Sequence, residues 1–300
     1  MISVTILGNN SALPAYGRNP TSQYIQTEKD CFLIDCGEGT QLQLTKYKLK
    51  RSKISHIFIS HLHGDHYFGL IGLLTSMSLL GRTQELHLHG HAMLEKIIQI
   101  QMEASESELS YPLYFHPLPS DGRIAETETC VISCFPVKHK IPCHGFLFVE
   151  KKNLRKIIPE KVKSFGVPDA FLEELKKGKD YIHPKGTIVS NDELTFSGDI
   201  PLKYAFCADT LYHEGLVSYI KGVDLLYYET TYLKDQNERA EKHNHSTTEQ
   251  AGLMATKAGV KKLLIGHFSS KYENLEPFLT ETQAIFSDTI LAIEGSCIKV

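Results

Sequence analysis

The stretch His61-Leu62-His63-Gly64-Asp65-His66 decides how the rest of the sequence is interpreted, because it places three imidazoles and one carboxylate within six residues. The apolar run before it, Ile54-Ser55-His56-Ile57-Phe58-Ile59-Ser60, predicts a buried strand. Side chains on a turn just after a strand are held by the sheet yet remain open to a ligand, and imidazole with carboxylate suits zinc. A chance cluster of structural histidines is the poorer interpretation, because a core would not bury an aspartate there without a compensating partner.

Composition describes an ordinary soluble globular protein. The 300 residues are 42% hydrophobic and 22% charged, which allows one large core or two small ones. A net charge of -3 argues against a general nucleic-acid binder, although a local basic patch is compatible with it. The seven cysteines are odd in number and form no CxxC pair, so we expect reduced thiols in a cytoplasmic protein. Neither a signal peptide nor a transmembrane helix is expected, because residues 1–8 resemble a strand and no window approaches 18 apolar residues.

Strands and helices alternate along the chain, which predicts an α/β fold. Short strands are expected to dominate residues 113–149. Ser246 is the predicted N-cap of a helix, with Glu249 at capping-box spacing. Other strands are expected at 2–7, 23–26, 31–36, 54–60, 85–89, 202–208, 223–228, 262–265 and 290–293, and helices at 41–48, 69–80, 92–102, 246–258 and 274–286.

Residues 150–187 differ in character from the rest of the chain. They carry ten Lys or Arg against six Asp or Glu, a local charge of +4 that leaves -7 elsewhere. Proline and glycine punctuate the segment, and two short helices are expected between them. Charge alone leaves two interpretations open, a solvated helical surface or an arm that grips a polyanion.

Further candidate ligands follow later apolar strands. His139, Asp209 and His267 each stand where a predicted strand ends. Taken singly, a histidine at such a position is more often structural than a ligand. Together they supply the donors that two metal ions would need beyond the four of the His61–His66 cluster, because strand ends of an α/β sheet converge on one edge.

The order HxHxDH, then a distant His, an Asp and a His, resembles the metallo-β-lactamase superfamily. More narrowly, the chain resembles the ribonuclease Z family of tRNA 3′-processing endonucleases, over nearly its whole length. The narrower resemblance rests on Phe-Leu-Ile-Asp-Cys-Gly-Glu-Gly-Thr-Gln at 32–41, Ala-Asp-Thr at 208–210, Tyr-Glu-Thr-Thr at 228–231, His-Ser-Thr at 245–247 and Gly-His-Phe-Ser at 266–269.

The resemblance implies two Zn²⁺ ions per chain, with Mn²⁺ as an alternative. One ion would be held by His61, His63 and His139, the second by Asp65, His66 and His267, and Asp209 would bridge them. Asp199 in Ser197-Gly198-Asp199 resembles the same kind of turn. Asp209 is preferred because it ends a longer apolar strand and has the more family-like separation from Glu229.

The resemblance also implies catalytic roles. Asp65 is expected as a ligand that also accepts the proton of the attacking water, and His245 as the general acid, with Glu229 orienting its ring. Without the resemblance, His245 would be interpreted as a polar residue before a helix. Asp35 is expected either to accept hydrogen bonds from ligand histidines or to be a turn carboxylate, and Lys271 to contact phosphate.

The fold implied is a four-layer αβ/βα sandwich, a single catalytic domain over residues 1–300 with an inserted basic helical arm at 150–187. The arm would bind precursor tRNA, and a homodimer is expected, whereas DNA and membranes are not expected as partners. Lys271 and Tyr228 depart from the usual arginine and histidine of the family, which affects the expected strength of tRNA binding and not the metal ligands.

Two other functions compete with this interpretation. A hydrolase of small phosphodiesters on the same scaffold would not need a basic insertion. A non-catalytic RNA-binding subunit would not need a complete ligand set. An oxidoreductase on this fold lacks support because no flavin-binding domain follows the core.

Overall fold

The structure, a computed structural model, describes residues 2–151, 154–198 and 200–300, and the chain divides into two compact units. The main unit comprises Met1–Glu150 and Leu202–Val300, and the insertion unit comprises Lys151–Pro201. Each unit has its own hydrophobic core. No helix among the described residues is long and apolar enough to cross a membrane.

The first sheet of the main unit has seven strands in the order β18-β1-β2-β3-β4-β5-β6. From β3 to β6 the strands are parallel, so their carboxyl ends share one edge. The strands are β1 (Ser3–Gly8), β2 (Ser22–Gln26), β3 (Cys31–Ile34), β4 (Ile54–Phe58), β5 (Leu86–Gly90), β6 (Leu113–Pro117) and β18 (Cys297–Lys299).

The second sheet of the main unit also has seven strands, in the order β17-β16-β15-β14-β9-β8-β7. Its strands from β14 to β17 are parallel, so they too end at one edge. The strands are β7 (Gly122–Glu126), β8 (Cys130–Val137), β9 (Cys143–Glu150), β14 (Lys203–Cys207), β15 (Leu225–Glu229), β16 (Lys262–Gly266) and β17 (Thr289–Leu291).

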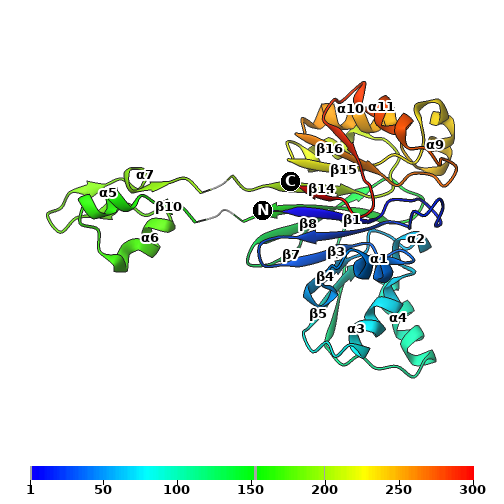
Figure 1. Cartoon of the computed structure of the whole chain (residues 1–300), viewed down its shortest axis with the longest axis horizontal. Helices are drawn as coiled ribbons and strands as arrows, with labels where there is room; N and C mark the ends of the chain where they lie inside the picture. The colour runs from blue at the N-terminus through cyan, green and yellow to red at the C-terminus, as the bar shows by residue number, and fades with distance from the viewer. Residues whose placement is uncertain (1, 152–153, 199) are drawn as a thin grey trace. The chain divides into compact units, whose positions relative to one another are not determined.

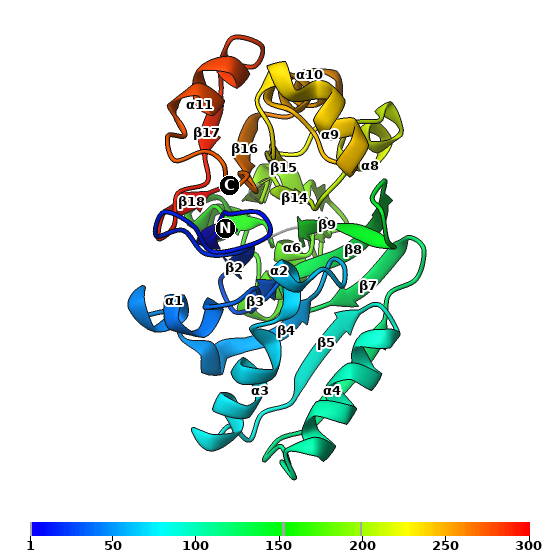
Figure 2. The same cartoon turned by 90° about the vertical axis from the view of Figure 1, so that its right-hand side faces the viewer.

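Helices cover the outer face of each sheet, so the main unit has four layers (Figures 1 and 2). Aromatic side chains such as Phe58, Phe148 and Phe206 fill the space between the sheets, and leucines of α3 pack on the outer face of the first sheet. The predicted αβ/βα sandwich is thereby confirmed. The helices are α1 (Thr40–Lys46), α2 (Gly64–Tyr67), α3 (Leu70–Leu79), α4 (Met93–Ala104), α8 (Val217–Ile220), α9 (Asn237–His243), α10 (Thr248–Ala258) and α11 (Glu276–Gln283).

Two local expectations were wrong. The N-cap of α10 is Thr247 and not Ser246, and its capping box is closed by Gln250 and not Glu249. The hydroxyl of Ser246 instead donates to the carbonyl of Thr210, a contact between distant segments that the sequence does not reveal. The chain also continues past the last expected strand into β18, which pairs with β1.

The insertion unit extends beyond residue 187, where the arm was expected to end, to Pro201. The extra residues belong to the unit because they supply the second strand of each of its two-stranded ribbons, and they bury Val189 and Leu194 in its core. The end of the arm was predicted from lysine content, which carries no information about strand pairing. Its elements are β10 (Lys156–Ile157), α5 (Pro159–Ser164), α6 (Leu172–Lys176), β11 (Tyr181–Ile182), β12 (Ile188–Val189), α7 (Asn191–Leu194) and β13 (Thr195–Phe196).

Candidate metal centre

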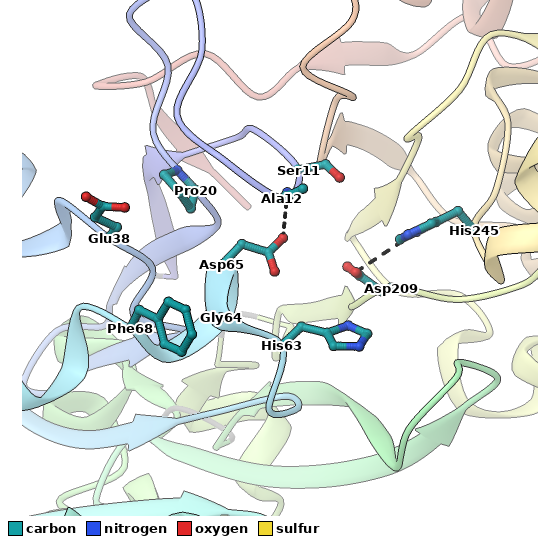
Figure 3. Close-up of a pocket in the computed structure, with 10 residues that line it drawn as sticks. All are labelled: Ser11, Ala12, Pro20, Glu38, His63, Gly64, Asp65, Phe68, Asp209 and His245. Atoms are coloured by element: carbon teal, nitrogen blue, oxygen red, sulfur yellow. Dashed lines mark hydrogen bonds and ion pairs between the residues drawn. The ribbon is translucent and has the colours of Figure 1, made fainter. Parts of the chain in front are cut away.

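The structure brings all nine predicted site residues together in the main unit. Ligand candidates follow β4, β8, β14 and β16, and the acid pair lies at the end of β15 and just before α10. Figure 3 shows four of the nine, His63, Asp65, Asp209 and His245, around one pocket. The full set is His61, His63, Asp65, His66, His139, Asp209, Glu229, His245 and His267.

The first group of donors consists of His61, His63 and His139. The Nδ1 atom of His63 lies 3.0 Å from Nε2 of His61 and 3.1 Å from Nε2 of His139. Both Nε2 atoms present lone pairs, because the Nδ1 atom of His139 donates to the carbonyl of Asn244 and that of His61 lies 3.1 Å from the hydroxyl of Ser60. The Nδ1 atom of His63 is the third nitrogen of the group. If it carries a proton, that proton can hydrogen-bond to only one of the two Nε2 atoms, whereas a cation could bind all three nitrogens.

The second group consists of Asp65, His66 and His267. The Nε2 atoms of His66 and His267 lie 3.6 and 3.5 Å from Oδ2 of Asp65. Both nitrogens are buried, and among the described residues neither has a hydrogen-bond partner. Buried polar atoms without partners are costly in an ordinary core, so this arrangement fits a bound cation.

Asp209 faces both groups with different oxygens. Its Oδ2 lies 3.8 Å from Nε2 of His61 and 3.9 Å from Nε2 of His139, whereas its Oδ1 lies 3.4 Å from His66 and 3.2 Å from His267. The Oδ1 atom has no hydrogen-bond partner within the described part of the chain. Burial would raise the pKa of Asp209, but His267 and His66 outweigh burial and lower it well below its usual value. A charged carboxylate between two donor groups has the geometry of a bridging ligand.

The donor set fits metal binding. Seven imidazole and carboxylate side chains form two groups that share one carboxylate, and imidazole with carboxylate is the ligand chemistry of zinc and manganese. A third grouping, Asp209, His245 and His267, also brings donor atoms within 4.8 Å of one another. Because His245 belongs to this third grouping, it is a candidate both for a metal ligand and for a general acid.

Asp35 holds the ring of His66 in place. Its Oδ2 accepts a hydrogen bond from Nδ1 of His66 at 2.7 Å, and Ser60 donates to both carboxylate oxygens through its amide and its hydroxyl. The bond fixes the tautomer that turns Nε2 of His66 toward the centre. Asp35 has φ 55° and His267 has φ 62°, left-handed conformations that are rare for such residues and typical of functional sites.

Thr231 links the second group to the acid pair. Its hydroxyl donates to Oε2 of Glu229 at 2.8 Å and lies 2.9 Å from Nδ1 of His267, which donates to it. Neither Thr231 nor Ser60 has a role that the sequence predicts. Their only signal was proximity to candidate ligands in the chain.

His245 and Glu229 form the predicted pair. The Nδ1 atom of His245 donates to Oε1 of Glu229 at 2.8 Å, and Glu229 is fully buried. Burial would lower the pKa of His245, but Glu229 outweighs burial and raises it to about 9. A protonated imidazole is a good proton donor, which suits His245 to the acid role.

A pocket of about 360 Å³ opens at the centre. Asp65, Asp209 and His245 line it together with residues that were not expected there, including Phe68 and Ala12 (Figure 3). The amide of Ala12 donates to Oδ2 of Asp65 at 2.7 Å, a backbone contact without a sequence signal. Lys271, expected near phosphate, is not among the lining residues. Asp199, the alternative to Asp209, lies outside the described residues.

A family model matches half of the chain, and known relatives match nearly its full length. A family model described as "Anti-Pycsar protein Apyc1" matches residues 2–155, which places that half of the chain in its sequence family. Ribonuclease Z of Bacteroides fragilis is 43% identical over 297 residues and covers 98% of both chains. The chain belongs to the ribonuclease Z family. Ribonuclease Z of Cytophaga hutchinsonii is also 43% identical, covering 98% of this chain and 95% of its own.

Solved structures agree with this family and with its fold. Human tRNase Z, short form, has a TM-score of 0.72 at 27% identity and covers 99% of this chain and 98% of its own. The metallo-β-lactamase fold protein YhfI from Bacillus subtilis has a TM-score of 0.71 at 18% identity, with full coverage of both chains, and supports the fold alone. The predicted family and fold are therefore confirmed.

Proposed function

We propose that the chain is a zinc-dependent endoribonuclease that removes the 3′ trailer from precursor tRNA in the cytoplasm, with two Zn²⁺ ions at the seven donors. The observation that carries the proposal is Asp209, whose two oxygens face separate groups of histidines. Two metals about 3.5–4 Å apart are the usual solution for in-line displacement at phosphorus. Bound ions would supply charge neutralisation at the phosphate and activation of water.

Hydrolysis breaks one phosphorus–oxygen bond, and the oxygen that leaves must take up a proton. His245 is the proposed donor, because its ring lines the pocket and is 14% exposed while Glu229 holds Nδ1 and leaves Nε2 free for the leaving oxygen. Glu229 also accepts from the amides of Thr210 and Thr231, so its carboxylate is fixed before substrate arrives.

Asp65 is the proposed acceptor of the proton from the attacking water. Its carboxylate is held from outside the metal groups by the amide of Ala12, which leaves the other oxygen directed into the pocket (Figure 3). The Nε2 atoms of His66 and His267 lie 3.6 and 3.5 Å from the Oδ2 atom that accepts from Ala12. The backbone contact thereby orients the carboxylate beside the second group of donors.

The direct test is cleavage of a labelled precursor tRNA with a 3′ trailer, with and without chelator, beside Asp65→Ala. We expect one chelator-sensitive cut at the start of the trailer, lost in the variant, and two zinc ions per chain by metal analysis. Absence of RNA cleavage together with metal-dependent hydrolysis of a small phosphodiester would favour the small-substrate alternative. Metal content near zero in a chain that still binds RNA would favour the non-catalytic alternative.

The insertion unit is proposed to bind the tRNA body. Between residues 151 and 201 the sequence has ten basic and eight acidic residues, so the net charge is +2 and not the +4 of the shorter segment. Several lysines of this unit are paired with Glu173 or Glu174. Lys161 and Lys163 of α5 are exposed and have no carboxylate partner among the described residues, so they are the better candidates for phosphate contacts.

Replacing Lys161 and Lys163 by alanine should therefore weaken precursor tRNA binding and reduce the salt dependence of log Kd by about one unit for each phosphate that the protein no longer neutralises. The matched control is alanine at Lys176 and Lys177, which pair with Glu173 and Glu174. Filter binding between low and moderate salt provides the slopes. Equal losses of affinity in both double variants would mean that the unit contributes only diffuse charge.

A homodimer is proposed from the family resemblance. Leu79 and Leu80 at the end of α3 are 88% and 64% exposed, and they are the apolar side chains that we propose such an interface would bury. Light scattering on the purified protein tests the stoichiometry, and a monomer at micromolar concentration would exclude a stable dimer.

A further inference from the structure

The catalytic pocket has a second end that the proposed chemistry does not use. Phe68, Glu38 and Pro20 line the end of the pocket that lies across Asp65 from His245 (Figure 3). Phe68 is 65% exposed, which is unusual for a phenylalanine. Glu38 is exposed as well.

The ring of Phe68 packs on its neighbours along one side and faces solvent on the other. It lies against the backbone of Gly64, where a Cβ atom would come within 2.2 Å of its Cε2 atom, and it meets the ring of Tyr67 at 5.0 Å and 65°. Glycine at position 64 is thus what allows the ring to lie beside the ligand turn. A solvent-facing aromatic ring that is already packed on one side offers its other face to a flat partner, and few side-chain rotations have to be restricted when that partner stacks on it.

Glu38 indicates what that partner is. Its carboxylate makes no hydrogen bond or ion pair within the described part of the chain. A free carboxylate repels phosphate but accepts hydrogen bonds from the amino groups of nucleobases. The turn that carries it is fixed by close packing, since a Cβ on Gly37 would meet the carbonyl of Asp65 at 2.4 Å and Pro20 at 2.7 Å.

We propose that Phe68 and Glu38 form a subsite for one unpaired nucleobase, with Phe68 as the stacking face and Glu38 as the acceptor for a base amino group. This inference rests on the proposed RNA cleavage. His245 serves the leaving oxygen at the other end of the pocket, so the bound base belongs to the nucleotide that keeps the phosphate. Unpaired bases are commonly bound by stacking on aromatic side chains with hydrogen bonds to their edges.

The test is a double-mutant cycle in which one change is made in the protein and the other in the substrate. Precursor tRNAs carry an abasic residue at one or the other nucleotide flanking the cut, and each is cleaved by the wild type, Phe68→Ala and Phe68→Trp. We expect the abasic residue on the phosphate-keeping side to lower kcat/KM of the wild type roughly 5- to 150-fold, the range for loss of one stacked base. Phe68→Ala should lower it similarly on the intact substrate, the two changes together should cost no more than either, and Phe68→Trp should restore the rate.

The matched control is Ile100→Ala, another exposed apolar side chain, which does not line the pocket. Metal content of each variant is measured beside the rates. Multiplicative losses, an abasic effect only at the leaving nucleotide, or no abasic effect in the wild type would each overturn the subsite. Failure of the wild type to cut the unmodified precursor would instead overturn the proposed function.

Glu38→Gln tests the edge contact separately. With each of the four bases at the phosphate-keeping position, the wild type should cut the uracil substrate roughly 5-fold or more slowly than those with amino-bearing bases. The variant should reduce that difference while retaining the abasic effect. Equal rates for all four bases in the wild type would show that Glu38 does not read the base.

Discussion

Two clusters of histidines lie on the first sheet, and they show that residue type alone does not make a metal site. His61, His63 and His66 follow the end of β4, where the carboxylate of Asp209, which follows β14 of the second sheet, reaches His61 and His66. The second cluster lies within the strands, where rings from β4, β5 and β6 stack on one another, and it consists of His56, His87, His89 and His116.

Carboxylates account for the difference between the clusters. In the metal centre, burial lowers the pKa of His61, His63 and His139, but at His66 the carboxylates of Asp209 and Asp65 outweigh burial and raise the pKa well above its usual value. In the stack, burial and neighbouring rings lower the pKa of His56 to about 4 and that of His89 to about 2. His56 and His89 form a hydrogen-bonded pair at 3.0 Å, and no group of three or more donors of the stack converges among the described residues. The stack is therefore neutral packing, whereas the centre is a set of donors.

Removing the shared carboxylate should produce the largest effect. Asp209→Asn keeps the size of the side chain but removes the charge that faces both histidine groups. We expect a loss of at least about 10³-fold in kcat on precursor tRNA, because both ions lose a ligand, and a fall in bound metal by mass spectrometry or atomic absorption. His87→Asn in the stack should change neither by more than about 2-fold.

Equal loss of metal in Asp209→Asn and His87→Asn would break the distinction between the clusters. Loss of activity with full metal content in Asp209→Asn would remove Asp209 from the ligands and leave it an electrostatic role.

The acid pair should give the next largest effect. His245→Asn removes the proposed proton donor and should lower kcat about 10²- to 10⁴-fold with little change in metal content. His243→Asn, two residues earlier on α9 and exposed, is the matched control. A large loss of metal in His245→Asn would assign His245 to the ligands instead.

Glu229→Gln sharpens the same assignment through pH. Glu229 raises the pKa of His245 to about 9, so the wild type keeps its acid protonated through neutral pH. Removing the charge should lower that pKa and move the alkaline limb of the kcat profile to lower pH. A limb that stays in place would show that His245 is not the group that titrates.

The centre was predictable from sequence because its ligands are concentrated in six residues and at strand ends. Strand positions were mostly right for the same reason, since apolar runs such as residues 54–60 are buried in the sheet. The stack has no signal in the sequence, because His87 and His89 alternate with leucines and meet His56 only through strand pairing. Pairing across the sequence also explains the missed β18 and the late end of the insertion unit.

Phe68 illustrates a different limit of sequence analysis. An aromatic residue is usually expected in the core, whereas Phe68 lies against Gly64 and stays exposed. The contact that Ala12 makes with Asp65 has no side-chain signal at all, since it uses a backbone amide. Contacts of this kind depend on loop geometry and not on residue type.

Removing the carboxylate that holds the ring of a ligand histidine should have an intermediate effect. Asp35→Asn removes the charge that accepts the hydrogen bond from Nδ1 of His66. Metal affinity should fall about 10- to 100-fold, the usual cost of losing such a partner, as measured by competition with a chelator. Asp30→Asn is the control, because Asp30 is a similarly hydrogen-bonded carboxylate that accepts from Thr127 and Thr129 away from the centre. Equal affinities in the two variants would mean that Asp35 only supports the fold.

The stack should have the smallest effect, and it should appear in stability and not in activity. The folded protein holds His56 and His89 neutral below their ordinary pKa of 6.5, whereas the unfolded chain takes up protons there. When the metal has been removed with a chelator, the free energy of unfolding should therefore fall as pH decreases from 6.5 toward 4. The expected fall is about 1.4 kcal/mol per pH unit for each such histidine. His89→Gln should make urea-unfolding free energies less steep over this range, whereas His183→Gln in the insertion unit should not. If the unfolding free energy of His89→Gln depends on pH as steeply as that of the wild type, His89 takes up its proton in the folded protein. The stack could then hold a charged histidine, as the metal centre does.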